Sequence, residues 1–189
     1  MFKILAIVPA TPFALVLSAL SYALLFFTNA WLTHDLVFGL GVNWIFLPAG
    51  LRLFLTLIFG LPGALGIVLA SFFISYFGEF GQNLSVCIGV ALVSGFAPYL
   101  AKVFVLKNVQ LQPDLSDLSL QKLMFCILAY ALFSAGAHQL WFSTQGLENA
   151  GTFNNFLVMF IGDVVGSLLL VALIKYGLDV LKRTKRIDR

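Results

Sequence analysis

The sequence is poor in charged residues. Only 10% of its 189 residues are Asp, Glu, Lys or Arg, whereas 61% are hydrophobic. Because soluble domains carry roughly 25% charged residues, this composition excludes a water-soluble domain and indicates an integral membrane protein. The formal net charge is +3, and the basic residues are spread over loop ends and one short tail. Such a distribution is typical of membrane topology signals, so we expect a lipid bilayer, and no nucleic acid, as a partner.

Residues for catalysis and metal binding are also scarce. The chain has two cysteines, Cys87 and Cys126, and two histidines. The cysteines lie in apolar runs that we expect to place them toward opposite membrane faces, too far apart for a disulfide, which needs Cα atoms within about 7 Å. Neither cysteine has a metal-ligand spacing. With no phosphate loop, nucleophile–base pair or paired carboxylates either, we expect two free thiols, no metal, no cofactor and no enzymatic activity.

Long apolar runs are abundant instead. A spanning helix needs about 20 apolar residues, and continuous rather than alternating runs favour a helix bundle over a barrel. The sequence therefore predicts an all-α membrane protein, a six-helix transmembrane bundle. The expected helices cover about 4–27, 36–59, 61–77, 84–105, 123–142 and 153–174. We expect one six-span domain over residues 1–181, a short interfacial helix within 107–122, a basic cytoplasmic tail at 182–189 and no further folded domain.

Three of the expected loops have no Lys or Arg and contain Asp35, Glu79 and Glu148. Placing both termini in the cytoplasm puts every basic residue on or toward the cytoplasmic side, as the positive-inside rule requires. Trp31 and Trp141 then lie at the outer interface. The pattern predicts a multi-pass membrane protein with both termini cytoplasmic.

Two ionisable residues lie deep in apolar runs. At 1.5 Å per residue, Asp163 is roughly 15 Å from the outer end of its helix and Arg52 roughly 12 Å from the cytoplasmic end of its own. A charge at the bilayer centre costs about 2.5–3.5 kcal/mol, so we expect both to face the bundle interior and to interact directly or through water or ligand. The alternatives are a purely structural ion pair, or an arginine that extends to the interface beside a protonated Asp163.

Proline and glycine interrupt the expected second helix at Pro48 and Gly50. A proline inside a helix frees carbonyls one turn earlier, and broken backbone at membrane depth is tolerated where it lines a cavity. We therefore predict a proline-broken second helix beside a cavity, to which Asn43 and Trp44 contribute polar groups. A simple kink is the alternative.

Polar side chains near the outer ends of other helices complete the candidate site. His138 and Asn154, with their neighbours Gln139 and Asn155, are expected to form an outward-facing polar mouth. Glycines flank Asp163 and would let another helix approach it closely. The predicted ligand-binding residues are Asn43, Trp44, Pro48, Gly50, Arg52, His138, Asn154 and Asp163.

Three motifs carry a resemblance to a known family. They are Asn-Trp-x-x-x-Pro-Ala-Gly-Leu at 43–51, Gly-Leu-Pro-Gly-Ala-Leu-Gly at 60–66 and Gly-Asp-Val-Val-Gly at 162–166. Together they resemble the type-one membrane-associated sensor domain, the membrane input module of bacterial diguanylate cyclases and histidine kinases. The resemblance implies a bacterial inner (cytoplasmic) membrane location and a bundle that senses or binds a small molecule.

The chain departs from that family at several points. The family usually has further helices and a cytoplasmic signalling domain, a proline where Phe46 or Leu47 stands, and an apolar residue at the position of Arg52. We therefore expect signal output through a separate membrane or signalling partner. Six helices in this length also resemble the substrate-binding subunits of energy-coupling-factor importers. The alternatives to a sensing bundle are therefore such a subunit or another small transporter component, and a structural or assembly membrane protein.

Overall fold

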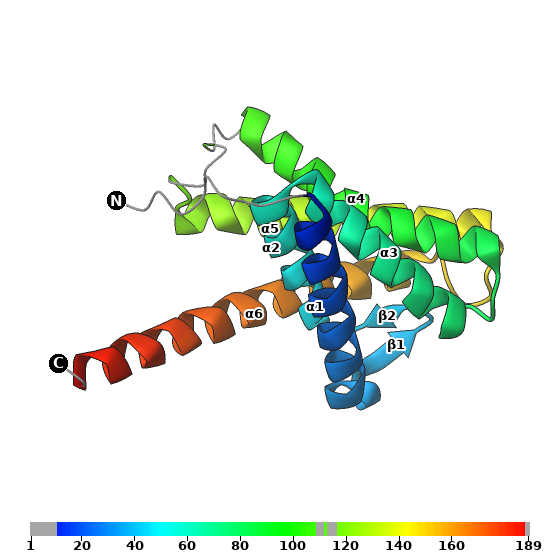
Figure 1. Ribbon diagram of the computed structural model, residues 1–189. Helices are drawn as coiled ribbons and strands as arrows, with labels where there is room; N and C mark the ends of the chain where they lie inside the picture. The colour runs from blue at the N-terminus through cyan, green and yellow to red at the C-terminus, as the bar shows by residue number, and fades with distance from the viewer. Residues whose placement is uncertain (1–10, 109–111, 113–116, 188–189) are drawn as a thin grey trace.

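The computed structural model describes residues 11–108, 112 and 117–187, and six α-helices account for most of them (Figure 1). The elements in chain order are α1 (Thr11–Leu32), η1 (His34–Leu36), β1 (Val37–Gly39), β2 (Val42–Asn43), α2 (Leu47–Phe59), α3 (Leu61–Phe77), α4 (Leu84–Asn108), α5 (Leu120–Thr144) and α6 (Phe153–Ile187). The all-α class predicted from the apolar runs is confirmed.

Four helices, α1, α4, α5 and α6, are long and apolar enough to cross a membrane. Their outward faces carry large apolar side chains, for example Leu24 on α1 and Leu100 on α4, as expected where lipid is the solvent. The helices α2 and α3 are shorter, with 13 and 17 residues. Six complete spans therefore stay a prediction.

The prediction of a second helix beginning near residue 36 and broken by proline is wrong. Residues 37–43 form an antiparallel hairpin in which Val37 pairs with Asn43, with Gly41 in the turn at φ 67°. The helix α2 begins at Leu47, and Pro48 lies in its first turn. Proline suits this position because the first amides of a helix have no intrahelical acceptor, so Pro48 helps to start a helix rather than interrupting one.

A tight turn at Gly60 joins α2 and α3, in agreement with the expected helix ends at 59 and 61. Gly60 has a φ of 62° and donates its amide to Thr56 O at 2.9 Å. Lys102 of α4 donates its ammonium to Thr56 O at 3.1 Å and to Leu57 O at 2.9 Å. A cation at a helix C-terminus compensates the carbonyls that lack intrahelical partners, so Lys102 fixes α4 against the end of α2.

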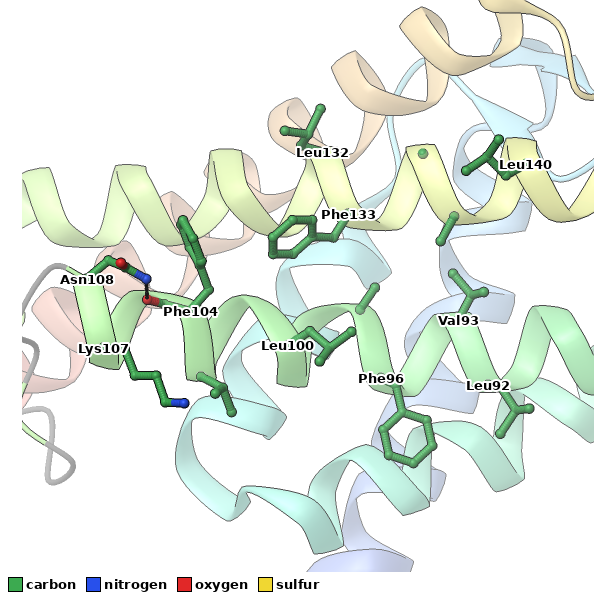
Figure 2. Close-up of a pocket in the computed structure, with 14 residues that line it drawn as sticks. Leu92, Val93, Phe96, Leu100, Phe104, Lys107, Asn108, Leu132, Phe133 and Leu140 are labelled. Atoms are coloured by element: carbon green, nitrogen blue, oxygen red, sulfur yellow. Dashed lines mark hydrogen bonds between the residues drawn. The ribbon is translucent and has the colours of Figure 1, made fainter.

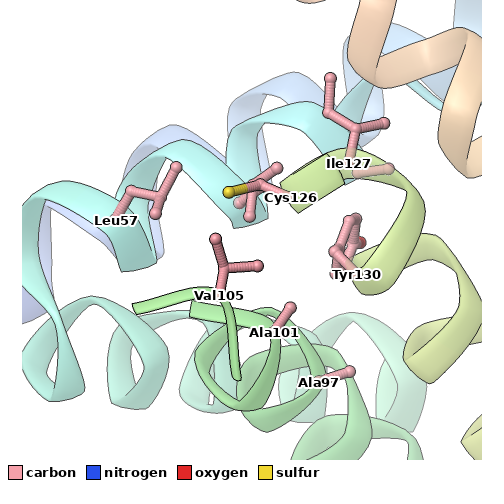
Figure 3. Packing of buried hydrophobic residues seen from close by; sticks show 9 residues of the cluster. Leu57, Ala97, Ala101, Val105, Cys126, Ile127 and Tyr130 are labelled. Atoms are coloured by element: carbon pink, nitrogen blue, oxygen red, sulfur yellow. The ribbon is translucent and has the colours of Figure 1, made fainter. Parts of the chain in front are cut away.

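The main apolar core lies between α2, α4 and α5, where Leu57, Val105 and Ile127 pack together (Figure 3). Cys126 belongs to this cluster, and both cysteines are free and buried, as predicted. Elsewhere α3 packs between α1 and α4, and α2 packs on α6. The C-terminal half of α6 extends away from the other helices (Figure 1).

Two predicted boundaries fall partly outside the described residues. The first helix was expected from about residue 4, but residues 1–10 are not described, and most of the expected interfacial helix within 107–122 is not described either. Asp117 and Ser119 form the described approach to α5, where Ser119 Oγ accepts the amide of Lys122 at 3.3 Å. The expected tail beyond residue 181 continues α6 as far as Ile187.

Candidate functional site

A small polar cavity lies in the interior of the helix bundle. Its volume is about 50 Å³, and because one water needs about 10–15 Å³, it has room for a few waters or for one very small molecule. The polar residues that line it are Tyr22, Asn43, Arg52, Ser71, Ser75, Glu79 and His138. They come from α1, β2, α2, α3, the α3–α4 connection and α5.

Arg52 is the charged centre of this cavity and is only 4% exposed. Its Nη2 donates a hydrogen bond to the Tyr22 hydroxyl. Its Cζ lies 4.9 Å from the centroid of the Tyr22 ring and 5.1 Å from that of Phe46, which gives two cation–π contacts. Nε and Nη1 are buried without an acceptor among the described residues. Because a buried donor without a partner costs about 1–3 kcal/mol or more, these atoms are ready to bind an acceptor.

Asp163 supplies the complementary group. It is 1% exposed, and neither carboxylate oxygen has a hydrogen-bond donor among the described residues. It interacts electrostatically with Arg52. However, the ion pairs that the described residues form are His34–Asp35 and Lys122–Asp117. A direct Arg52–Asp163 pair is therefore not formed, and an interaction through water or ligand stays a prediction.

Gly162 and Gly166 of α6 allow residues 43–46, which end the hairpin and lead into α2, to lie beside Asp163. We call residues 43–46 the hairpin segment. A Cβ on Gly162 would lie 2.1 Å from Asn43 O, and a Cβ on Gly166 would lie 2.0 Å from Phe46 O. Phe46 N also donates to Gly162 O at 3.2 Å. The predicted close approach at these glycines is present, but the partner is the extended backbone of residues 43–46 and not a helix. Glycine is required because any side chain would separate the two backbones.

Asn29 of α1 stabilises the same extended segment and was missed by sequence reasoning, which placed it in a polar connection. Its Oδ1 accepts the amide of Leu47 at 2.9 Å, and its Nδ2 donates to Thr33 Oγ1 at 3.0 Å. Asn29 thus satisfies one of the first amides of α2, which have no intrahelical acceptor. An amide side chain near the end of an apolar run was the only available signal.

His138 and Gln139 lie at the same level of α5 but have different roles. His138 Nδ1 lies 2.8 Å from Ser134 O, so Nδ1 carries a proton and donates, and Nε2 lies 3.4 Å from Ser94 Oγ. His138 was expected at an outward-facing mouth, but it is buried and lines the interior cavity. Gln139 Oε1 accepts the amide of Gly151 at 3.0 Å, so it secures the α5–α6 connection.

The structure brings some predicted site residues together and separates others. Asn43, Arg52 and His138 line the cavity, whereas Trp44 is 43% exposed and packs edge-on against Phe38. Asn154 is exposed and does not line the cavity, so its place in an outward-facing mouth stays a prediction.

Three other residues at this level have structural roles. Asn155 is buried and donates to Asn149 O at 2.7 Å. Pro48 and Gly50 are buried in the first turn of α2, and a Cβ on Gly50 would lie 2.8 Å from Ser167 Cα. Gly50 therefore serves the packing of α2 on α6 and does not contact the cavity.

Hydroxyl groups extend the polar interior beyond the predicted residues. Tyr130 interacts electrostatically with both Arg52 and Asp163 and lies beside Ser134. The hydroxyls of Tyr130, Ser134 and Ser167 are all buried. Ser71 and Ser75, four residues apart on α3, both face the cavity. Their helical spacing is the signal that could have assigned them to one face.

No group of three or more His, Cys, Asp or Glu side chains in the described part of the chain is arranged to hold a metal ion. Comparisons of this chain with family models, with curated proteins and with solved structures find no match. The resemblance to the sensor family therefore rests on the three motifs alone.

Proposed function

We propose that this protein is a multi-pass membrane protein that binds a small polar molecule inside its helix bundle and acts through a separate partner protein. The observation that supports this proposal is the buried pair Arg52 and Asp163. Two guanidinium nitrogens of Arg52 and both carboxylate oxygens of Asp163 lack hydrogen-bond partners among the described residues. Arg52 lines a cavity in which polar and apolar side chains are mixed, whereas Asp163 lies outside its lining. Intramembrane charges that are not neutralised by each other favour a binding role.

The chemistry of the site restricts the ligand. Arg52 presents donors to the cavity, whereas Glu79 and the lining hydroxyls present acceptors. Since the lining carries both a guanidinium and a carboxyl group, a neutral or zwitterionic molecule that carries both an acceptor and a donor fits better than an ion. The cavity volume of about 50 Å³ favours a molecule of a few heavy atoms.

Access to the site is proposed from the outer face. The cavity reaches Gly41 at the tip of the hairpin and Glu79 in the α3–α4 connection. With both termini in the cytoplasm, these two residues lie on the outer side of the bilayer. The same orientation puts Lys102, Lys107 and the basic end of α6 on the cytoplasmic side, as the positive-inside rule favours.

Native mass spectrometry of the full chain, released gently from its own membrane, tests the interior site. We expect the wild-type protein to carry a small polar molecule and Asp163→Asn and Asn43→Ala to lose it. Arg183→Met is the control, because it removes an exposed positive charge outside the cavity. A wild-type protein without such a molecule, or its equal loss from the Arg183 variant, would show that the interior-site proposal is wrong.

The partner is tested in the same preparation. Co-purifying signalling proteins would support a sensor, whereas co-purifying ATPase and membrane transport subunits would support an importer component. A protein partner without any small molecule would favour an assembly role instead.

A further inference from the structure

A second feature of the molecule lies on the outside of the helix bundle. An apolar groove of about 1010 Å³ runs between α4 and α5 (Figure 2). Leu100, Phe104 and Phe133 form its walls, Leu92 and Leu140 lie at one end, and Lys107 lies at the other. The groove does not share a lining residue with the interior cavity, so the two sites are independent.

The apolar surface between α4 and α5 continues past Leu92 as far as Ser85 and Gln145, and its part from Lys107 to Leu92 has the length of one leaflet of a bilayer. Leu92 and Lys107 are about 22 Å apart along α4 at 1.5 Å per residue. A bilayer of about 40–45 Å, headgroups included, provides roughly 20–22 Å per leaflet. One phospholipid molecule aligned with α4 would therefore extend from Lys107 to the level of Leu92 and Leu140.

The charge at the groove is confined to its Lys107 end. Lys107 lies in the last turn of α4, and the ion pairs of the described residues do not include it. The neighbouring Asn108 amide donates to Phe104 O at 2.7 Å, so it is satisfied locally. Figure 2 shows both side chains at the same end of the groove. A single ammonium group above an apolar surface is complementary to a lipid with a negative headgroup and apolar chains.

The groove also has an open floor at Gly136. A Cβ at this position would meet no atom within 4 Å. Glycine is a poor residue for a helix interior, where it costs roughly 0.5–1 kcal/mol relative to alanine. Gly136 therefore leaves space that an acyl chain can fill.

We propose that this groove binds one anionic phospholipid, with its phosphate at Lys107 and one acyl chain along Leu100 and Phe133 toward Gly136. In the orientation proposed above, this lipid belongs to the cytoplasmic leaflet. Its binding does not depend on the interior ligand site. Lys107 selects the headgroup charge, and the apolar walls hold the chain.

Native mass spectrometry of the full chain, exchanged into mixtures of phosphatidylglycerol and phosphatidylcholine, tests this proposal. We expect wild-type protein to retain one phosphatidylglycerol with at least a tenfold preference over phosphatidylcholine. Lys107→Gln should reduce the preference to about one while lipid is still retained. Gly136→Leu adds a side chain to the floor, starting from a Cβ that meets no atom within 4 Å, and should lower the retention of both lipids. Lys175→Gln, an exposed charge on α6 outside the groove, should behave as wild type.

Three results would overturn the proposal. Equal retention of the two lipids by the wild-type protein would remove the selective site. If Lys107→Gln kept the preference for phosphatidylglycerol, or if Lys175→Gln lost it, the preference would come from the surface charge in general and not from Lys107. A membrane protein partner that leaves on Gly136→Leu, with no lipid preference in the wild type, would show that the groove is a helix-docking surface.

Discussion

Replacing Gly162 by alanine should separate the hairpin segment from α6. The new Cβ would lie 2.1 Å from Asn43 O, and this neighbour is backbone that cannot rotate away. The shift would also break the hydrogen bond from Phe46 N to Gly162 O, which is 3.2 Å long. Because Asn43 lines the interior cavity, the substitution should disturb the ligand site as well as the fold.

The expected cost follows from two contributions. Overpacking of a tight contact typically costs 1–3 kcal/mol, and loss of one hydrogen bond costs about 0.5–1.5 kcal/mol. Together they predict a loss of about 1.5–4.5 kcal/mol in the free energy of unfolding. For a protein of this length, 1 kcal/mol corresponds to about 2–4 °C in Tm, so we expect Tm to fall by about 3–18 °C.

The matched control lies on the same helix. A Cβ at Gly177 would meet no atom within 4 Å, so Gly177→Ala adds a methyl group without a clash. It should be neutral or stabilising by up to about 1 kcal/mol, since alanine is the better helix former. Thermal unfolding of wild type and both variants in the same detergent compares them directly. Equal changes in Tm for the two variants would refute the close contact between α6 and residues 43–46.

Three further substitutions probe the interior and the approach to α5. Tyr22→Phe removes the acceptor of the Arg52 Nη2 hydrogen bond and should lower the free energy of unfolding by about 1–3 kcal/mol; an unchanged Tm would contradict this contact. Asn29→Ala leaves the first amide of α2 without its acceptor and should cost about 1–2 kcal/mol, measured by the same unfolding assay; a Tm equal to that of wild type would contradict this hydrogen bond. The hydrogen bond from Lys122 lowers the pKa of Asp117 below its usual range, so the stabilisation is present above about pH 4 and is lost as the pH falls through the lowered pKa. An NMR titration of Asp117 should show this, and Lys122→Gln should return the pKa toward its usual value.

Much of the fold could be predicted from the sequence because it depends on composition and local backbone chemistry. Low charge and continuous apolar runs required helices that bury their own backbone polar groups. The Gly60–Gly63 turn and the two free cysteines followed from local residue type and spacing. The burial of Arg52 and Asp163 followed from the cost of exposing a charge to lipid.

Other features depended on tertiary contacts. Residues 36–46 are mostly apolar and were assigned to a helix although they contain Gly39 and Gly41. They form a hairpin with Gly41 in its turn, and the segment after it packs on Gly162 and Gly166. Whether an apolar segment forms a helix or an extended segment depends on the surface it meets, and that surface lies far away in the sequence.

The pairing of buried polar groups is the clearest difference between sequence and structure. Sequence position gave Arg52 and Asp163 similar depths, but Arg52 donates to Tyr22 of α1, and Asp163 lies beside the hairpin segment. Composition determines which residues leave water, because the free energy of transferring a side chain out of water depends on that side chain alone. Which buried donor meets which acceptor depends on the rotation and depth of each helix relative to its neighbours, and only the packed bundle sets these.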